Sequence, residues 1–207
     1  AEYQEGRTEE AGRRYQQALD LLQRAADQRT EAMLRNNLGL IRQATGDAGQ
    51  AEQLFRQAMA LNQAAGHPAA QASNHVNLGI LAEERREYEV AEREFERALE
   101  LDKTAGRRAE IAADLLRLGR VAERRGFPDR GLAYSERAYR SYLAQGNQAQ
   151  AIAAITFALD CARRLGLVEE VRPDVTNVSK YFARPGTPAR GLGGLVSSAV
   201  VKERSAR

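Results

Sequence analysis

Few side chains in this chain have the chemistry for catalysis or metal binding. Its 207 residues hold two histidines, His67 and His75, and one cysteine, Cys161. A zinc site needs three or four such ligands, and no third ligand stands near the two histidines. Cys161 has no neighbouring histidine to activate it as a nucleophile, and the GLGG sequence at 191–194 precedes an apolar run rather than opening a helix after a strand. We therefore predict no metal, no cofactor and no enzymatic activity.

The composition predicts an all-α protein. The chain has 37 Ala and 28 Arg but only 3 Lys, 5 Pro and no Trp, and alanine and arginine rank among the best helix formers. No apolar run approaches the roughly 20 residues that a transmembrane helix needs. Five basic residues and one acidic residue give residues 183–207 a charge of +4, so a total of +3 leaves residues 1–182 at −1. That charge does not favour nucleic-acid binding.

A 40-residue repeat organises most of the chain. Leu-Gly pairs recur at 38–39, 78–79 and 118–119, and the order alanine, aromatic, alanine recurs at Ala11, Tyr15, Ala18, Ala51, Phe55, Ala58, Ala91, Phe95 and Ala98. Separations of three, four and seven residues place such side chains on one helix face. Two glycine series with the same period mark helix ends: Gly6, Gly46, Gly126 and Gly166, and Gly66, Gly106 and Gly146, with Arg86 as the exception.

The glycines divide each repeat into two helices. We predict second helices near 8–25, 48–65, 88–105, 128–145 and 168–182, with first helices between them. Thr8, Asp47 and Pro128 are suited to begin second helices, as caps or as a first-turn proline. Residues 1–5 are then expected to be the end of a first helix whose main part is missing.

This order of residues resembles the tetratricopeptide repeat, and NNLG at 36–39 and VNLG at 76–79 resemble its long-helix branch, which includes kinesin light chains and spindle adaptors. The resemblance covers residues 1–182 and implies an all-α, right-handed superhelical solenoid of antiparallel helix hairpins with four to five repeats. It implies a partial first unit at 1–26, repeats near 30–65, 68–105 and 108–145, and a degenerate C-terminal cap at 148–182. Ser135 stands where the aromatic residue belongs in the fourth unit. We expect the Pro/Gly-rich basic tail at 183–207 to be flexible.

The resemblance also implies a partner-facing stripe on each first helix. Transferred to this chain, it comprises Met33, Asn37, Leu40 and Ala44; Ser73, Asn77, Ile80 and Glu84; Ala113, Arg117, Arg120 and Arg124; and Ala153, Phe157, Asp160 and Arg164. Asn37 and Asn77 correspond to asparagines that bond the main chain of a partner peptide in that family. An amide suits this role because it offers both donors and acceptors. The alternative is that both are solvated or locally bonded.

Arginines change the character of the stripe in its C-terminal half. Arg117, Arg120 and Arg124, with Arg164 one repeat later, would make it electropositive, and guanidinium groups pair well with carboxylates. We therefore expect an acidic side chain or a free C-terminal carboxylate of the partner there. The alternative is an exposed charged face whose arginines pair with Glu123 and with neighbours such as Asp160.

These features predict a non-catalytic scaffold that binds a peptide or helix of a partner protein. The alternative is a self-assembling structural subunit that forms homo-oligomers through the N-terminal unit or the tail. Arg-rich, Ala-rich repeats of this style are similar to those of bacterial periplasmic or lipid-anchored envelope proteins, the interpretation we favour, and to sensor regions of cytoplasmic regulators. The 207 residues contain no signal-peptide pattern that would decide between the two.

Overall fold

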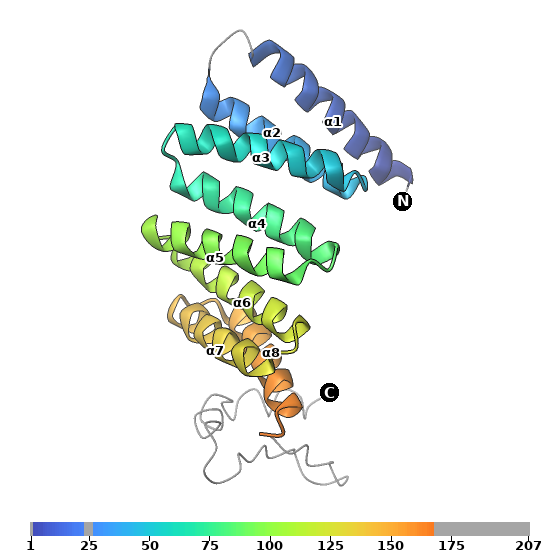
Figure 1. Ribbon diagram of the computed structural model, residues 1–207. Helices are drawn as coiled ribbons and strands as arrows, with labels where there is room; N and C mark the ends of the chain where they lie inside the picture. The colour runs from blue at the N-terminus through green and yellow to red at the C-terminus, as the bar shows by residue number, and fades with distance from the viewer. Residues whose placement is uncertain (1, 23–26, 168–207) are drawn as a thin grey trace. The chain divides into compact units, whose positions relative to one another are not determined.

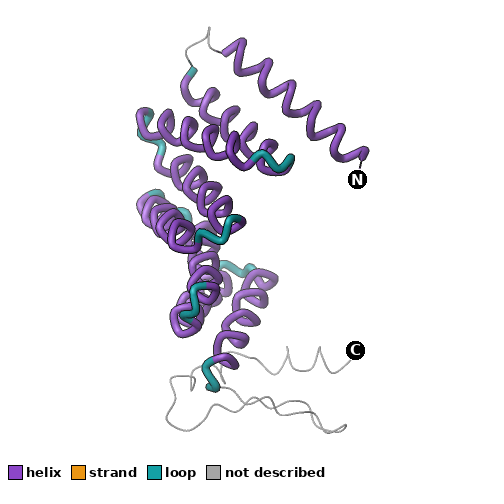
Figure 2. Tube along the Cα trace, turned by 45° about the vertical axis from the view of Figure 1, so that its right-hand side comes forward, coloured by secondary structure: helices purple, strands orange, loops and turns teal. Residues whose placement is uncertain are grey.

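The computed structural model describes residues 2–22 and 27–167, which form helices and the turns between them (Figure 1). The helices are α1 (Glu2–Leu22), α2 (Gln28–Ala44), α3 (Ala48–Ala64), α4 (Pro68–Glu84), α5 (Tyr88–Thr104), α6 (Arg108–Arg124), α7 (Pro128–Ala144) and α8 (Gln148–Arg164). No strand occurs in these two ranges (Figure 2). Nor is any helix within them long and apolar enough to cross a bilayer. The predicted all-α class is confirmed.

The described helices belong to two compact units, and the division falls inside α6, after Asp114. In the first unit α2 packs against α3 and α4 against α5 as helical hairpins, while α1 packs on α2 and α3 on α4. In the second unit α7 packs against α8. The second helices predicted at 48–65, 88–105 and 128–145 are α3, α5 and α7. The one predicted at 168–182, and the tail at 183–207, lie outside the described residues.

The start of α1 differs from the prediction. We expected one helix to end near Gly6 and another to begin at Thr8, but α1 runs through both positions. A glycine inside a helix costs only about 1 kcal/mol relative to alanine, so it does not by itself end the helix. It closes a helix where the backbone turns left-handed, as at Gly46, Gly66, Gly106, Gly126, Gly146 and Gly166.

The turns that follow α2 to α8 share one geometry. After α2, Gly46 has a φ of 84°, and the Asp47 N–H donates to the Arg42 carbonyl at 2.8 Å. This bond closes a Schellman turn. Arg86 occupies the glycine position after α4 and adopts a φ of 60°. The predicted helix starts at Asp47 and Pro128 are confirmed, because Asp47 caps α3 and Pro128 is the first residue of α7.

Aromatic rings fill the space that the Leu-Gly glycines leave in the first unit. A Cβ atom on Gly39 would lie 2.6 Å from the Phe55 ring, and one on Gly79 would lie 2.5 Å from the Phe95 ring. Both rings are fully buried. The glycine is therefore a steric requirement of each hairpin, as its recurrence indicates.

In the second unit, different side chains pack beside the glycine of the Leu-Gly pair. Ser135 is buried at the aromatic position, and its hydroxyl donates to the Gly131 carbonyl at 2.6 Å. A Cβ atom on Gly119 would lie 3.2 Å from that carbonyl oxygen and 3.5 Å from the ring of Phe157 in α8. Helices α6 and α7 thus approach backbone to backbone, and an aromatic side chain from α8 fills part of the space beside Gly119. Phe157, which the stripe assigned to a partner, contacts the core beside Gly119.

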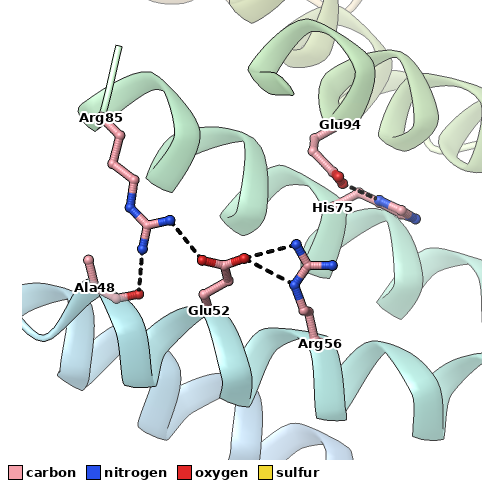
Figure 3. A network of polar contacts seen from close by, with 6 residues as sticks. All are labelled: Ala48, Glu52, Arg56, His75, Arg85 and Glu94. Atoms are coloured by element: carbon pink, nitrogen blue, oxygen red, sulfur yellow. Dashed lines mark hydrogen bonds and ion pairs between the residues drawn. The ribbon is translucent and has the colours of Figure 1, made fainter. Parts of the chain in front are cut away.

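Ion pairs on α3 connect this helix to the end of α4 (Figure 3). The Glu52 carboxylate accepts hydrogen bonds from Arg85 at 2.7 Å and from Arg56 at 2.8 Å. The hydrogen bond from Arg85, and after it the one from Arg56, lower the pKa of Glu52 below its ordinary value. The charged form of Glu52 therefore stabilises the fold.

We expect Glu52→Gln to lower the free energy of unfolding by about 0.5–1 kcal/mol at pH 7, as is typical of partly exposed ion pairs. Because the folded-state pKa is depressed, this contribution is present above the unfolded-state pKa of about 4.5 and is lost as the pH falls through the folded-state value. Urea unfolding between pH 7 and pH 3 should show the two proteins converging. Glu96→Gln, at an exposed position of α5, is the control. A Glu52→Gln difference that does not vary with pH would contradict the ion-pair explanation.

Candidate partner-binding surface

The two histidines occupy structural positions. His67 lies in the turn between α3 and α4, directly before Pro68, the first residue of α4. His75 Nδ1 lies 2.7 Å from a carboxylate oxygen of Glu94, so this pair joins α4 to α5 (Figure 3). Within residues 2–22 and 27–167, no three His, Cys, Asp or Glu side chains are grouped to hold a metal ion.

Cys161 is a core residue. Its side chain is fully buried, as are Leu81 and Val121 at the same phase of earlier repeats, so it packs as a small hydrophobic residue. Burial, and after it the charge of Glu123, raise the pKa of the Cys161 thiol to about 11. The thiol is therefore protonated at neutral pH and does not act as a nucleophile.

We expect native Cys161 to react with iodoacetamide at pH 8 roughly 100-fold more slowly than the same cysteine in the unfolded chain, because the reactive species is the thiolate. The measurement is the labelled fraction over time by intact mass, with and without guanidinium chloride. Rapid labelling under native conditions would contradict the buried position.

The stripe on α2 exposes apolar side chains around one amide. Met33 is 54% exposed and Leu40 is 42% exposed, although most large apolar side chains of the first unit are covered. Asn37 lies between them, half-buried, and its Nδ2 donates to the Tyr15 hydroxyl of α1 at 3.4 Å. The surface therefore combines two uncovered apolar side chains with one half-buried amide.

The stripe on α4 continues this surface. Ser73, Asn77 and Ile80 are half-buried, and Glu84 is exposed. Glu84 accepts a hydrogen bond from Gln43 of α2 at 2.8 Å, so α2 and α4 are connected near their C-terminal ends. We call the residues of these two stripes, 33, 37, 40, 44, 73, 77, 80 and 84, the first-helix face.

An asparagine network lies beside the first-helix face. Asn36 Oδ1 accepts from Asn77 Nδ2 at 2.8 Å and from Asn74 Nδ2 at 3.0 Å. Asn74 Oδ1 in turn accepts from Asn62 Nδ2 of α3 at 2.8 Å. The periodicity selects Asn37 and Asn77 because they have equal phase, and it overlooks Asn36, whose only signal is the Asn-Asn pair at 36–37.

The arginines of the predicted stripe lie in the second unit. Arg120 is exposed, and the side chains of Arg124 and Arg164 are 64% and 66% exposed. The mostly buried Glu123 carboxylate pairs with Arg164 and lies 4.0 Å from Arg124 Nε. One carboxylate thus brings two of the predicted arginines together, from α6 and α8. Arg117, which lies one turn before Arg120 in α6, is half-buried.

The chain belongs to the tetratricopeptide repeat family, whose model matches residues 1–64 and 30–104. This confirms the resemblance that the Leu-Gly and alanine-aromatic-alanine patterns indicate. No curated protein matches the sequence.

Solved structures share the fold at low sequence identity. BtubC (BKLC) from P. vanneervenii is 24% identical with a TM-score of 0.63, over 68% of this chain and 59% of that one. The nearly identical TPR-like repeats of a Podosopora anserina kinesin light chain are 13% identical with a TM-score of 0.69, over 99% and 91%. A Rap protein complexed with competence and sporulation factor is 16% identical with a TM-score of 0.64, over 80% and 46%. The chain thus spans 59% of the BtubC chain and about half of the Rap chain.

Proposed function

We propose that the protein is a non-catalytic scaffold that binds a peptide or helical segment of a partner protein on the first-helix face. The observation that carries this proposal is the exposure of Met33 and Leu40 on either side of Asn37, since a partner would cover both apolar side chains. The family relationship supports a role in protein binding. The Rap structure offers an example of a related fold that was crystallised with a second molecule.

Asn37 and Asn77 are suited to forming hydrogen bonds with the main chain of a bound segment. Each uses its Nδ2 group in a bond within the protein, Asn37 to Tyr15 and Asn77 to Asn36. Among the described residues, neither Oδ1 atom has a hydrogen-bond donor. In this arrangement each amide retains an acceptor for the N–H groups of a bound segment.

The arginines support a preference for acidic partners. Arg120, Arg124 and Arg164, with Arg117 beside them, would pair with acidic side chains or with a C-terminal carboxylate. Glu123 pairs with Arg164 and lies near Arg124, so it brings these two arginines close together on the surface.

A displayed random-peptide library, selected on the wild-type protein, tests the proposal. We expect Asn37→Ala/Asn77→Ala to weaken the selected peptides about tenfold, because two hydrogen bonds of ordinary strength are lost. Gln53→Ala/Gln63→Ala, at exposed amides of α3, is the control and should leave affinity unchanged. Equal effects of both pairs, or no peptide ligand at all, would refute the proposal.

Self-assembly through the N-terminal unit is the second candidate. Ala11, Tyr15 and Ala18 of α1 are only half-buried, whereas their counterparts in α3 and α5 are fully buried. A second copy could cover this face of α1. Sedimentation velocity between micromolar and millimolar concentration decides: a monomer throughout excludes self-assembly, and a dimer that Tyr15→Arg disrupts supports it.

A further inference from the structure

We infer that Asn36 is a positioning residue that sets the polarity of the Asn77 side-chain amide, that is, which end of the amide faces the bound segment. Asn77 then presents its carbonyl oxygen and requires an N–H donor from that segment. The inference rests on the proposed function, because it specifies what that site reads. It gives a distinct role to a side chain outside the predicted stripe.

The geometry of the network ties four amides to one polarity. Asn36 Oδ1 accepts from both Asn74 and Asn77, which lie three residues apart on α4. Asn74 is 1% exposed, and its side-chain oxygen accepts a hydrogen bond from the buried Asn62. Turning one amide alone would place two oxygens or two NH₂ groups against each other, and the cost is greatest at Asn62 and Asn74, which are buried away from water. The amides therefore turn together or not at all.

Asn37 does not share this restriction. Within the described part of the chain, its side chain makes one hydrogen bond, to the Tyr15 hydroxyl, which is long at 3.4 Å, and a tyrosine hydroxyl can either donate or accept. Asn37 can therefore meet an N–H or a carbonyl of the bound segment, whereas Asn77 meets an N–H. The two asparagines have equal phase in the repeat, yet they differ in the main-chain groups with which they can form hydrogen bonds.

The free protein provides the first test. Asn36→Asp keeps an acceptor for both NH₂ groups but removes the donors that the opposite polarity would need. We expect the side-chain ¹H–¹⁵N signals of Asn74 and Asn77 to keep their hydrogen-bonded shifts in Asn36→Asp and to lose them in Asn36→Ala. Unchanged signals in Asn36→Ala, or loss of these shifts in Asn36→Asp, would overturn the inference. Gln53→Glu, exposed on α3, controls for the added charge.

A selected peptide provides the second test. Replacing its amides one at a time by esters removes single N–H donors. We expect one ester to weaken binding about threefold in the wild-type protein and in Asn36→Asp, because one hydrogen bond is lost, and to have no effect in Asn77→Ala. The absence of any ester position coupled to Asn77 would overturn the inference. If no peptide binds, the proposed function fails, whereas the spectra of the free protein still decide the polarity.

Discussion

Gly79→Ala is expected to lower the free energy of unfolding by about 2 kcal/mol, within the usual range for an overpacked core. The new Cβ would lie 2.5 Å from the Phe95 ring, and this ring is fully buried between α4 and α5 and cannot move aside freely. Alanine is the better helix former by about 1 kcal/mol, so the steric cost must exceed that gain.

A double-mutant cycle isolates the steric term. Phe95→Ala alone should cost about 3–5 kcal/mol, because it leaves a large cavity. In that background Gly79→Ala meets no ring, and its higher helix propensity should make it stabilising by about 0.5–1 kcal/mol. Urea unfolding of the four proteins measures the coupling energy.

Gly49→Ala is the matched control for this cycle. Gly49 is exposed in α3, and a Cβ atom there would have its nearest contact at 3.8 Å, with Asp47. We expect this variant to be neutral or more stable than the wild type by about 0.5 kcal/mol. Equal effects of Gly79→Ala with and without the Phe95 ring would contradict the packing that defines each hairpin.

Arg120→Glu/Arg124→Glu is expected to weaken acidic peptides selected on the wild-type protein about 100-fold at low salt. Each substitution removes a charge-assisted hydrogen bond and adds a repulsive charge. The dependence of affinity on salt should also flatten, because fewer opposite charges remain in contact. Fluorescence anisotropy at several sodium chloride concentrations measures both effects.

Arg97→Glu/Arg137→Glu carries the same change of net charge and serves as the control. Both arginines are exposed and lie on second helices, α5 and α7. This variant should change affinity only slightly, through long-range attraction. A loss of affinity equal to that of Arg120→Glu/Arg124→Glu would show that net charge, and not the predicted arginine site, attracts the peptides.

The helical hairpins could be predicted from the repeat because each repeated residue has a steric or conformational role. A glycine at position 79 admits a ring, and a glycine at position 46 closes a helix with a left-handed turn. The same logic predicted helix bounds to within a residue at α3, α5 and α7. It failed at Gly6, since the residue type permits a turn without requiring one.

The periodicity of the sequence could not predict which side chains make contacts between helices. Ser135 indicated a departure from the pattern, but only the structure shows that Phe157 of the next helix fills part of the space beside Gly119. Likewise, equal phase identified Asn77 but not Asn36, because the role of Asn36 depends on which helices are neighbours. Side chains whose function depends on another helix are the ones that a single repeat cannot reveal.

Chemical-shift mapping of a selected peptide on the ¹⁵N-labelled protein tests the central claim most directly. The proposed function predicts that the largest perturbations fall on amides of α2 and α4 around Met33, Asn37, Leu40, Asn77 and Ile80. It also predicts small changes on the exposed positions of α3 and α5. Perturbations concentrated on those second helices would show that the first-helix face is not the binding surface.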